Sequence, residues 1–192
     1  MFKIPMIADK RFFFLICSFL LLPLTGILIF YLANPFTNKC IQGNCKNGKG
    51  VYISASGMRY DGEWKNGKRD GQGNLTYPDG SKYTGNWENN RMRGQGIKIY
   101  ASDYMYKKYI GEWLNGNKHG KGTILYSGGE QYEGDLRNGE INGQGTYTAI
   151  DGRTLTGEWK DGILDGQVTE KFPDGRILAV KWENGKTWEK TN

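Results

Sequence analysis

The segment YDGEWKNGKRDGQGNLTYPDG, residues 60–80, sets bulky aromatic residues beside residues that have no side chain. Tyr60, Gly62 and Trp64 fall on alternate positions at its start. Side chains two positions apart lie on the same face of a β-strand. The segment therefore predicts a strand with two rings on one face and a bare patch between them.

The remainder of the segment predicts a return of the chain and a second turn. We expect a turn over 66–70 and a returning strand over 71–77. The Pro-Asp-Gly sequence at 78–80 is typical of a tight turn. Each such unit is then one β-hairpin with a short connection to the next. Because a lone hairpin is not stable in water, we expect the hairpins to stack on one another.

The same pattern recurs along the chain at intervals of 23, 26, 23, 23 and 23 residues. The units start at Tyr60, Tyr83, Tyr109, Tyr132, Leu155 and Leu178. Bulky residues also stand four positions later, at Trp64, Trp87, Trp113, Leu136, Trp159 and Trp182. Most of the 29 glycines fall on fixed positions of this period, so they reflect a repeat and not a flexible low-complexity chain.

Three units carry a resemblance to a known family. YDGEWKNGKRDGQGNLTYPDG (60–80), YIGEWLNGNKHGKGTILYSGG (109–129) and YEGDLRNGEINGQGTYTAIDG (132–152) resemble the MORN repeat, the membrane occupation and recognition nexus motif. The resemblance covers five full units and a truncated sixth, so the repeat array is expected over 60–192. It implies an all-β fold, an elongated single-layer antiparallel sheet of stacked hairpins, and a binding role without catalysis.

The repeats depart from the motif in two ways. Leu155 and Leu178 replace the opening aromatic residue, and Leu136 replaces a tryptophan. The second unit also holds three extra residues within YASDYMYKK, residues 100–108. We expect a bulged loop there, which is either a tolerated insertion or a contact with a partner. The aromatic residues expected to form the core are Tyr60, Trp64, Tyr83, Trp87, Tyr109, Trp113, Tyr132, Trp159 and Trp182.

The segment 34–59 predicts a linker followed by a half-repeat that caps the array. Glycines of the repeat period are still present at Gly48 and Gly50, but the first strand of the unit is replaced by CIQGNC. A disulfide between Cys40 and Cys45 would close this cap in an oxidising compartment, and the alternative is two unpaired thiols.

The N-terminus differs from the repeats in composition. A basic tail over 1–11 precedes 22 uncharged residues over 12–33, which include Cys17. At about 1.5 Å per helical residue this run reaches roughly 33 Å, enough to cross a bilayer. We expect one transmembrane anchor helix; the alternative is a cleaved secretory peptide. Basic residues directly before the span favour a cytoplasmic N-terminus, with the repeats periplasmic or otherwise extracytoplasmic.

The repeats offer few groups for chemistry. His119 is the only histidine, and we expect a structural or surface role for it at a turn position. One histidine and three cysteines supply no spacing for a metal site, and we expect no cofactor. Glu63, Glu112 and Glu158 recur on the face opposite the rings, which predicts solvated charges. We therefore expect no enzyme activity.

The chain carries a net charge of +6, and its basic residues gather in the first repeats. Residues 59–108 hold ten Lys or Arg against six Asp or Glu, whereas 155–192 hold six against seven. Five cations near the turns could touch anionic headgroups, or could belong to an ordinary surface: Lys65, Lys68, Arg69, Arg91 and Arg93. The function expected is a membrane-anchored scaffold or adaptor for a protein or cell-envelope partner. The alternative is a lipid-binding module, and nucleic acid is not expected as a partner.

Overall fold

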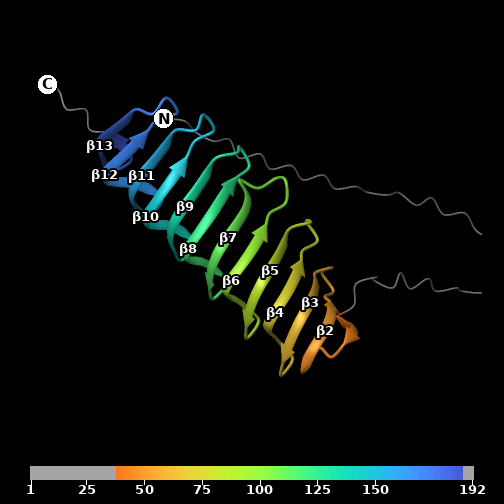
Figure 1. The fold of residues 1–192 in the computed structure, drawn as a ribbon. Coiled ribbons are helices and arrows are strands. Elements are labelled where there is room, and N and C mark those ends of the chain that lie inside the picture. Colours follow the sequence, from red (N-terminus) through yellow and green to blue (C-terminus); the bar gives the residue numbers. More distant parts are fainter. Residues whose placement is uncertain (1–37, 188–192) are drawn as a thin grey trace, which may run out of the picture. The chain divides into compact units, whose positions relative to one another are not determined.

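The computed structural model describes residues 38–187. The expected anchor over 12–33, the basic tail over 1–11 and the last residues, 188–192, lie outside the described part. Residues 38–187 form a single antiparallel sheet of 14 strands and contain no helix (Figure 1). The prediction of an all-β, single antiparallel sheet is confirmed. Within the described residues, no helix is long and apolar enough to serve as a membrane span.

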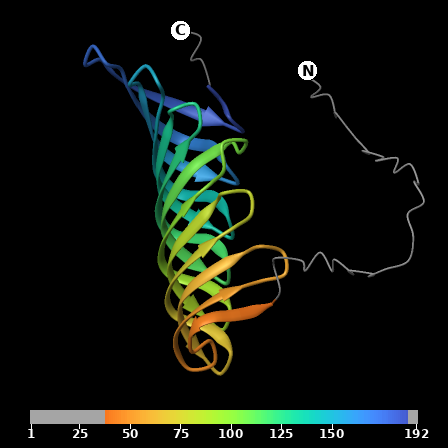
Figure 2. The same ribbon diagram turned by 90° about the vertical axis from the view of Figure 1, so that its right-hand side faces the viewer.

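The strands follow one another in the sheet in chain order. They are β1 (Lys39–Gly43), β2 (Gly48–Ile53), β3 (Arg59–Lys65), β4 (Lys68–Thr76), β5 (Lys82–Glu88), β6 (Arg91–Ile99), β7 (Tyr106–Leu114), β8 (Asn117–Tyr126), β9 (Gln131–Arg137), β10 (Glu140–Thr148), β11 (Thr154–Lys160), β12 (Ile163–Lys171), β13 (Ile177–Glu183) and β14 (Lys186–Thr187). Figure 2 shows the strands of this sheet twisting steadily from one to the next. The expected linker and cap over 34–59 supplies β1 and β2, and a disulfide joins Cys40 to Cys45.

The hairpin turns are shorter than the sequence indicated. The expected turn over 66–70 is a two-residue turn, Asn66–Gly67, and β4 already begins at Lys68. Both turn residues have positive φ, 50° and 73°. A two-residue turn that matches the strand twist needs positive φ at both positions, and Asn-Gly accepts this at little cost. In the second unit Asn89 and Asn90 adopt the same conformation, at 47° and 71°.

A bulge occupies the place where the longer turn was expected. Gly62 pairs with Gly73 and Trp64 pairs with Arg69, so one residue of β3 faces three residues of β4. Gly71, inside the bulge, has φ 102°. His119, the equivalent of Asp70 in the third unit, lies within β8, so the prediction that it occupies a turn is wrong.

A row of glycines runs straight across the sheet from β2 to β11. Its members pair in sequence: Gly50, Gly62, Gly73, Gly85, Gly96, Gly111, Gly122, Gly134, Gly145 and Gly157. A Cβ placed on Gly122 would stand 2.5 Å from the Tyr109 ring. The tyrosine rings therefore lie directly on the backbone, which only glycine allows.

The aromatic residues pack at right angles over this row. The rings of Tyr83 and Trp87 are 5.1 Å apart at 87°, and Tyr83 and Trp113 are 5.3 Å apart at 87°. Such edge-to-face contacts suit the charge distribution of aromatic rings. Tyr60, Tyr83, Tyr109 and Tyr132 are buried, as are Trp87, Trp113 and Trp159. Trp64 and Trp182, in the first and last units, are half-buried.

Each buried ring also has a partner for its polar atom. The Tyr109 hydroxyl donates to the Glu112 carbonyl at 2.8 Å, and Tyr83 repeats this with Asn86 at 3.0 Å. The Trp113 indole N–H donates to the carbonyl of Gly96 in the previous unit at 3.3 Å. Tryptophan thus links neighbouring units by both packing and a hydrogen bond.

Replacing Trp113 by alanine removes a ring that contacts two tyrosines and is only 4% exposed. We expect the free energy of unfolding to fall by about 3–5 kcal/mol, because a cavity opens between adjacent hairpins. Urea denaturation followed by tryptophan fluorescence or circular dichroism measures the change. Ile110→Ala, on an exposed side chain, is the control and is expected to stay within about 0.5 kcal/mol. A comparable small change for Trp113→Ala would contradict the packing described.

Candidate functional site

The two faces of the sheet differ in chemistry. The aromatic face, which carries the rings of Tyr60, Trp64 and their equivalents, is indented by a hollow near each end. The hollow at the N-terminal end measures about 430 Å³ and includes the disulfide, Tyr52, Trp64 and Arg69 in its lining. The hollow at the C-terminal end measures about 460 Å³. It is lined mainly by apolar side chains, among them Ile141, Leu155, Trp159, Leu164 and Trp182.

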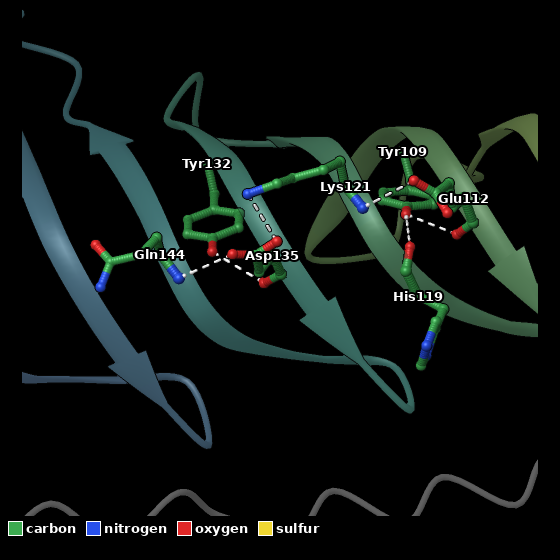
Figure 3. A network of polar contacts seen from close by, with 7 residues as sticks. All are labelled: Tyr109, Glu112, His119, Lys121, Tyr132, Asp135 and Gln144. Atoms are coloured by element: carbon green, nitrogen blue, oxygen red, sulfur yellow. Dashed lines mark hydrogen bonds and ion pairs between the residues drawn. The ribbon is translucent and has the colours of Figure 1, made fainter.

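The opposite face carries a polar network that corrects one expectation (Figure 3). Glu112 is half-buried and accepts the backbone N–H of Lys121 at 3.3 Å. Asp135, its equivalent in the next unit, accepts the backbone N–H of Gln144 at 3.0 Å and pairs with the Lys121 ammonium at 2.7 Å. These acids satisfy backbone donors that the bulge leaves free. Glu112 is therefore not the solvated charge that was predicted, whereas Glu158 is exposed.

His119 lies beside this network. Its carbonyl accepts the Tyr109 hydroxyl at 3.4 Å, and its ring nitrogen Nδ1 is buried with no hydrogen-bond partner. Among residues 38–187, no three His, Cys, Asp or Glu side chains converge to hold a metal ion. The opposite face also carries a hollow of about 830 Å³, lined by Ile110, Lys121 and Gln144 among others. The aromatic face is the candidate binding site, because it adds cations and exposed rings to its hollows.

Three cations stand on the aromatic face at positions that carry apolar residues in other units. Lys98 occupies the position of Leu75 and Ile124, and Lys118 occupies the position of Ile141 and Leu164. In the register of the sheet, Lys98 lies between Tyr83 and Tyr109, and Lys118 lies opposite Trp113. The third cation, Arg69, is the equivalent of Lys118 in the first unit. Sequence reasoning missed both lysines, although alignment of the units would have shown a cation in place of a core residue.

The two lysines lie over neighbouring tyrosine rings. The Lys98 ammonium is 5.1 Å from the centre of the Tyr77 ring and 5.2 Å from that of Tyr100. The Lys118 ammonium is 4.1 Å from the centre of the Tyr106 ring, and the Tyr100 and Tyr106 rings are 5.7 Å apart. We call these five residues the lysine–tyrosine cluster. Cation–π attraction partly compensates each ammonium for lost water. Neither ammonium forms an ion pair with a carboxylate of residues 38–187.

The inserted residues of the second unit complete this cluster. They form a loop between β6 and β7 that supplies Tyr104, whose ring is 5.8 Å from that of Tyr100. The loop is held on both sides. The Tyr104 hydroxyl donates to Asp79 at 3.2 Å, and the Ser127 hydroxyl donates to the Tyr104 carbonyl at 2.6 Å. Tyr104 and Met105 nevertheless remain 48% and 70% exposed, so they are open to a partner.

Burial sets the charges of the cluster. Burial, with a smaller contribution from the nearby charge of Lys98, lowers the pKa of Lys118 to about 8. Burial also lowers the pKa of Lys98, while the Asp79 carboxylate acts in the opposite direction. Burial raises the pKa of Tyr100 to about 12, so this phenol stays neutral at physiological pH. The cluster is therefore cationic at neutral pH, and within the described residues its ammonium groups form no ion pair.

The five cations predicted to contact lipid do not form one patch. Arg69 is half-buried on the aromatic face, with its guanidinium 4.3 Å from the centre of the Trp87 ring. Arg93 pairs with Glu88 at 2.8 Å. Lys65, Lys68 and Arg91 are exposed around the hairpin turns. Contact of these residues with headgroups stays a prediction.

A family model for the MORN repeat matches six segments of the chain: 46–59, 60–82, 83–103, 109–131, 132–152 and 156–175. The chain belongs to the MORN repeat family. The family resemblance seen in the sequence is thereby confirmed, and the match extends to part of the N-terminal half-repeat. The repeats of this MORN protein match no curated protein.

Two solved structures show a distant likeness to the MORN sheet. The SAS-4 (dCPAP) TCP domain of Drosophila melanogaster, in complex with a proline-rich motif of Ana2 (dSTIL), is 11% identical; the match covers 84% of this chain and 97% of that one, with a TM-score of 0.30. The TCP10 domain of Danio rerio CPAP, in complex with a STIL peptide, is 16% identical; the match covers 73% of this chain and 66% of that one, with a TM-score of 0.29.

Replacing Lys118 by leucine, the residue found at the equivalent position 164, is expected to stabilise the MORN sheet. An ammonium whose pKa is lowered by burial destabilises the folded state while it is charged. We expect a gain of about 1–2 kcal/mol at neutral pH, after a discount for the partly exposed charge. Urea denaturation measures it, with Lys82→Leu, an exposed lysine, as the control.

The pH dependence provides a second readout of Lys118. Because the folded state releases this proton near pH 8 and the unfolded chain near about 10.4, the unfolded chain binds more protons between these values. Stability of the unmodified chain should therefore rise with pH from about 8 to 10, and Lys118→Leu should reduce the rise. An equal rise in both proteins would show that Lys118 is not desolvated.

Proposed function

We propose that this protein is a membrane-anchored, non-catalytic MORN scaffold that binds a protein or cell-envelope partner on its aromatic face. The lysine–tyrosine cluster is the observation that carries this proposal. Its two ammonium groups are half-buried and form no ion pair within the described residues, and the exposed Tyr104 ring lies 5.8 Å from the Tyr100 ring of the cluster. Residues that lower stability are retained where function requires them.

The proposed lack of catalysis is supported by the groups on this face. Its ionisable side chains are mainly lysine, arginine and tyrosine. General acid–base catalysis most often uses histidine. The single histidine of the chain lies beside the opposite-face network, and no cofactor is invoked.

The anchor and the location of the repeats belong to the same proposal. The uncharged run over 12–33 is long enough to span a bilayer as a helix. We place the N-terminus in the cytoplasm and the repeats in a periplasmic or otherwise extracytoplasmic space. The disulfide between Cys40 and Cys45 supports this location, because such bonds persist in oxidising compartments.

Thiol labelling of the full chain in washed membranes checks the anchor and the location together. After rapid denaturation without reductant, an alkylating reagent should modify Cys17 alone, and reduction should expose Cys40 and Cys45. The chain should also stay with the membrane during alkaline carbonate extraction. Release by carbonate would contradict the anchor, and labelling of all three cysteines before reduction would contradict the oxidising compartment.

Photo-crosslinking tests the binding face. A photoreactive amino acid in place of Tyr104, in the full chain and in intact cells, should give a discrete adduct with one partner. The same amino acid in place of Ile110, exposed on the opposite face, is the matched control and should give none. Equal adducts at both positions, or adducts at neither, would contradict a partner on the aromatic face. Adducts with phospholipid alone would favour the alternative, a lipid-binding module that uses Lys65, Lys68 and Arg91.

A further inference from the structure

The aromatic face changes character along the array. Its first three units carry the cations Arg69, Lys98 and Lys118. The fourth and fifth units carry Ile141 and Leu164 at the position of Lys118 and form the apolar hollow. A partner that lies along this face therefore meets positive charge first and an apolar recess second.

The cationic part of the face has the charge needed to bind an anionic group. Both ammonium groups have lost water and contact rings, and neither forms an ion pair within residues 38–187, although the Asp79 carboxylate acts on Lys98 from a greater distance. A carboxylate placed between Lys98 and Lys118 would supply charge-assisted hydrogen bonds to both. Arg69 differs from them, because its guanidinium already donates to the Asn90 carbonyl at 3.0 Å.

Within residues 38–187, the apolar part of the face, around the C-terminal hollow, carries no unpaired charge of this kind. The buried acid on this side, Glu170, is 9% exposed and is paired with Arg153 at 3.0 Å. The hollow is open because Leu155 stands where the preceding units have tyrosine. A bulky apolar side chain of a partner would fill the space that the missing ring leaves.

We propose that the aromatic face binds an extended peptide segment that carries an acidic side chain and a bulky apolar side chain at a fixed separation. The acid lies on the lysine–tyrosine cluster and the apolar side chain enters the C-terminal hollow. This inference rests on the proposed function and specifies the chemistry of the partner. The hollow is lined by residues of β8 and of β10 to β13, and its side chains on β11 and β12, Leu155, Trp159 and Leu164, lie three to four strands from Lys118 on β8. At about 4.8 Å per strand the separation is roughly 14–19 Å, the reach of about four to six extended residues.

Charge and shape together favour a peptide over other anionic partners. A phosphate of lipid or nucleic acid would satisfy the two lysines equally well. Neither accounts for the apolar recess on the same face, because a nucleic acid has no apolar side chain and a phospholipid within a bilayer keeps its acyl chains in the membrane. A peptide supplies both groups on one chain, and the exposed Tyr104 offers it a further ring.

Selection from a random peptide library by messenger-RNA display, against the full chain in lipid nanodiscs, tests the proposal. Sequences enriched by the unmodified protein should share an acidic residue and a bulky apolar residue at a constant spacing. The doubly substituted protein Lys98→Met and Lys118→Leu should lose the acidic preference. Leu155→Tyr, which restores the ring of the four preceding repeats, should lose the apolar preference alone.

A labelled peptide from this selection then gives affinities by fluorescence anisotropy. We expect each lysine substitution to weaken binding about tenfold, as the loss of one charge-assisted contact. Lys82→Met removes an equal charge from the opposite face and should leave the affinity unchanged. Because Lys118→Leu is expected to stabilise the sheet, its loss of affinity would not reflect unfolding.

The outcomes separate this inference from the proposed function. Enriched peptides that lack an acidic residue, or that bind the lysine variants equally well, would overturn the inference and leave peptide binding on this face intact. Failure to enrich any peptide would contradict both the inference and peptide binding as the function of the face. Binding of the nanodisc lipid or of the library's nucleic acid in place of the peptide would also overturn it.

Discussion

Tyrosine rings lying directly on a row of glycines are the contact on which the rest of this sheet depends. A single layer of strands has no second layer to cover it, so it must bury apolar surface within itself. The ring of Tyr109 meets this need by resting against Gly122, and a side chain at that glycine would collide with it. Tryptophan from the neighbouring unit then closes over the tyrosine and bonds to the glycine carbonyl. Each hairpin is thus completed by the next one.

This dependence explains why departures from the repeat are informative. Where Val168 replaces the glycine, the indole N–H of Trp182 is buried without a partner, although its equivalents in other units reach the row. Such a site weakens the end of the array. Lys98 and Lys118 depart in another way, because they place charge among rings where leucine or isoleucine would pack. The repeats that build the sheet share the same pattern of rings and glycines, so the residues that differ between repeats, such as Lys98 and Lys118, give this surface its specific character.

The inserted loop shows how a small change in length acts on this surface. Three extra residues between β6 and β7 leave the row of glycines unbroken, since Gly96 still pairs with Gly111. The extra residues form a loop at the end of the strands. The Tyr104 hydroxyl donates a hydrogen bond to Asp79 in the turn before this loop, and the Ser127 hydroxyl in the turn after it donates to the Tyr104 carbonyl. The insertion consequently adds side chains beside the lysines without disturbing the core.

The sequence alone was sufficient to predict the fold. The alternation of aromatic residues and glycines lies within a short segment, and every repeat shows the same alternation. It indicated the hairpins, the antiparallel sheet and the family. The sequence predicted a turn over 66–70 that is longer than the observed one. The bulge at Gly71 arises from the pairing of β3 with β4, and the sequence of one strand alone does not indicate it. The lysine–tyrosine cluster was decided by tertiary structure alone. Lys98, Tyr106 and Lys118 come from different strands, and only the register of the sheet brings two cations onto adjacent rings, with no ion pair to either among residues 38–187.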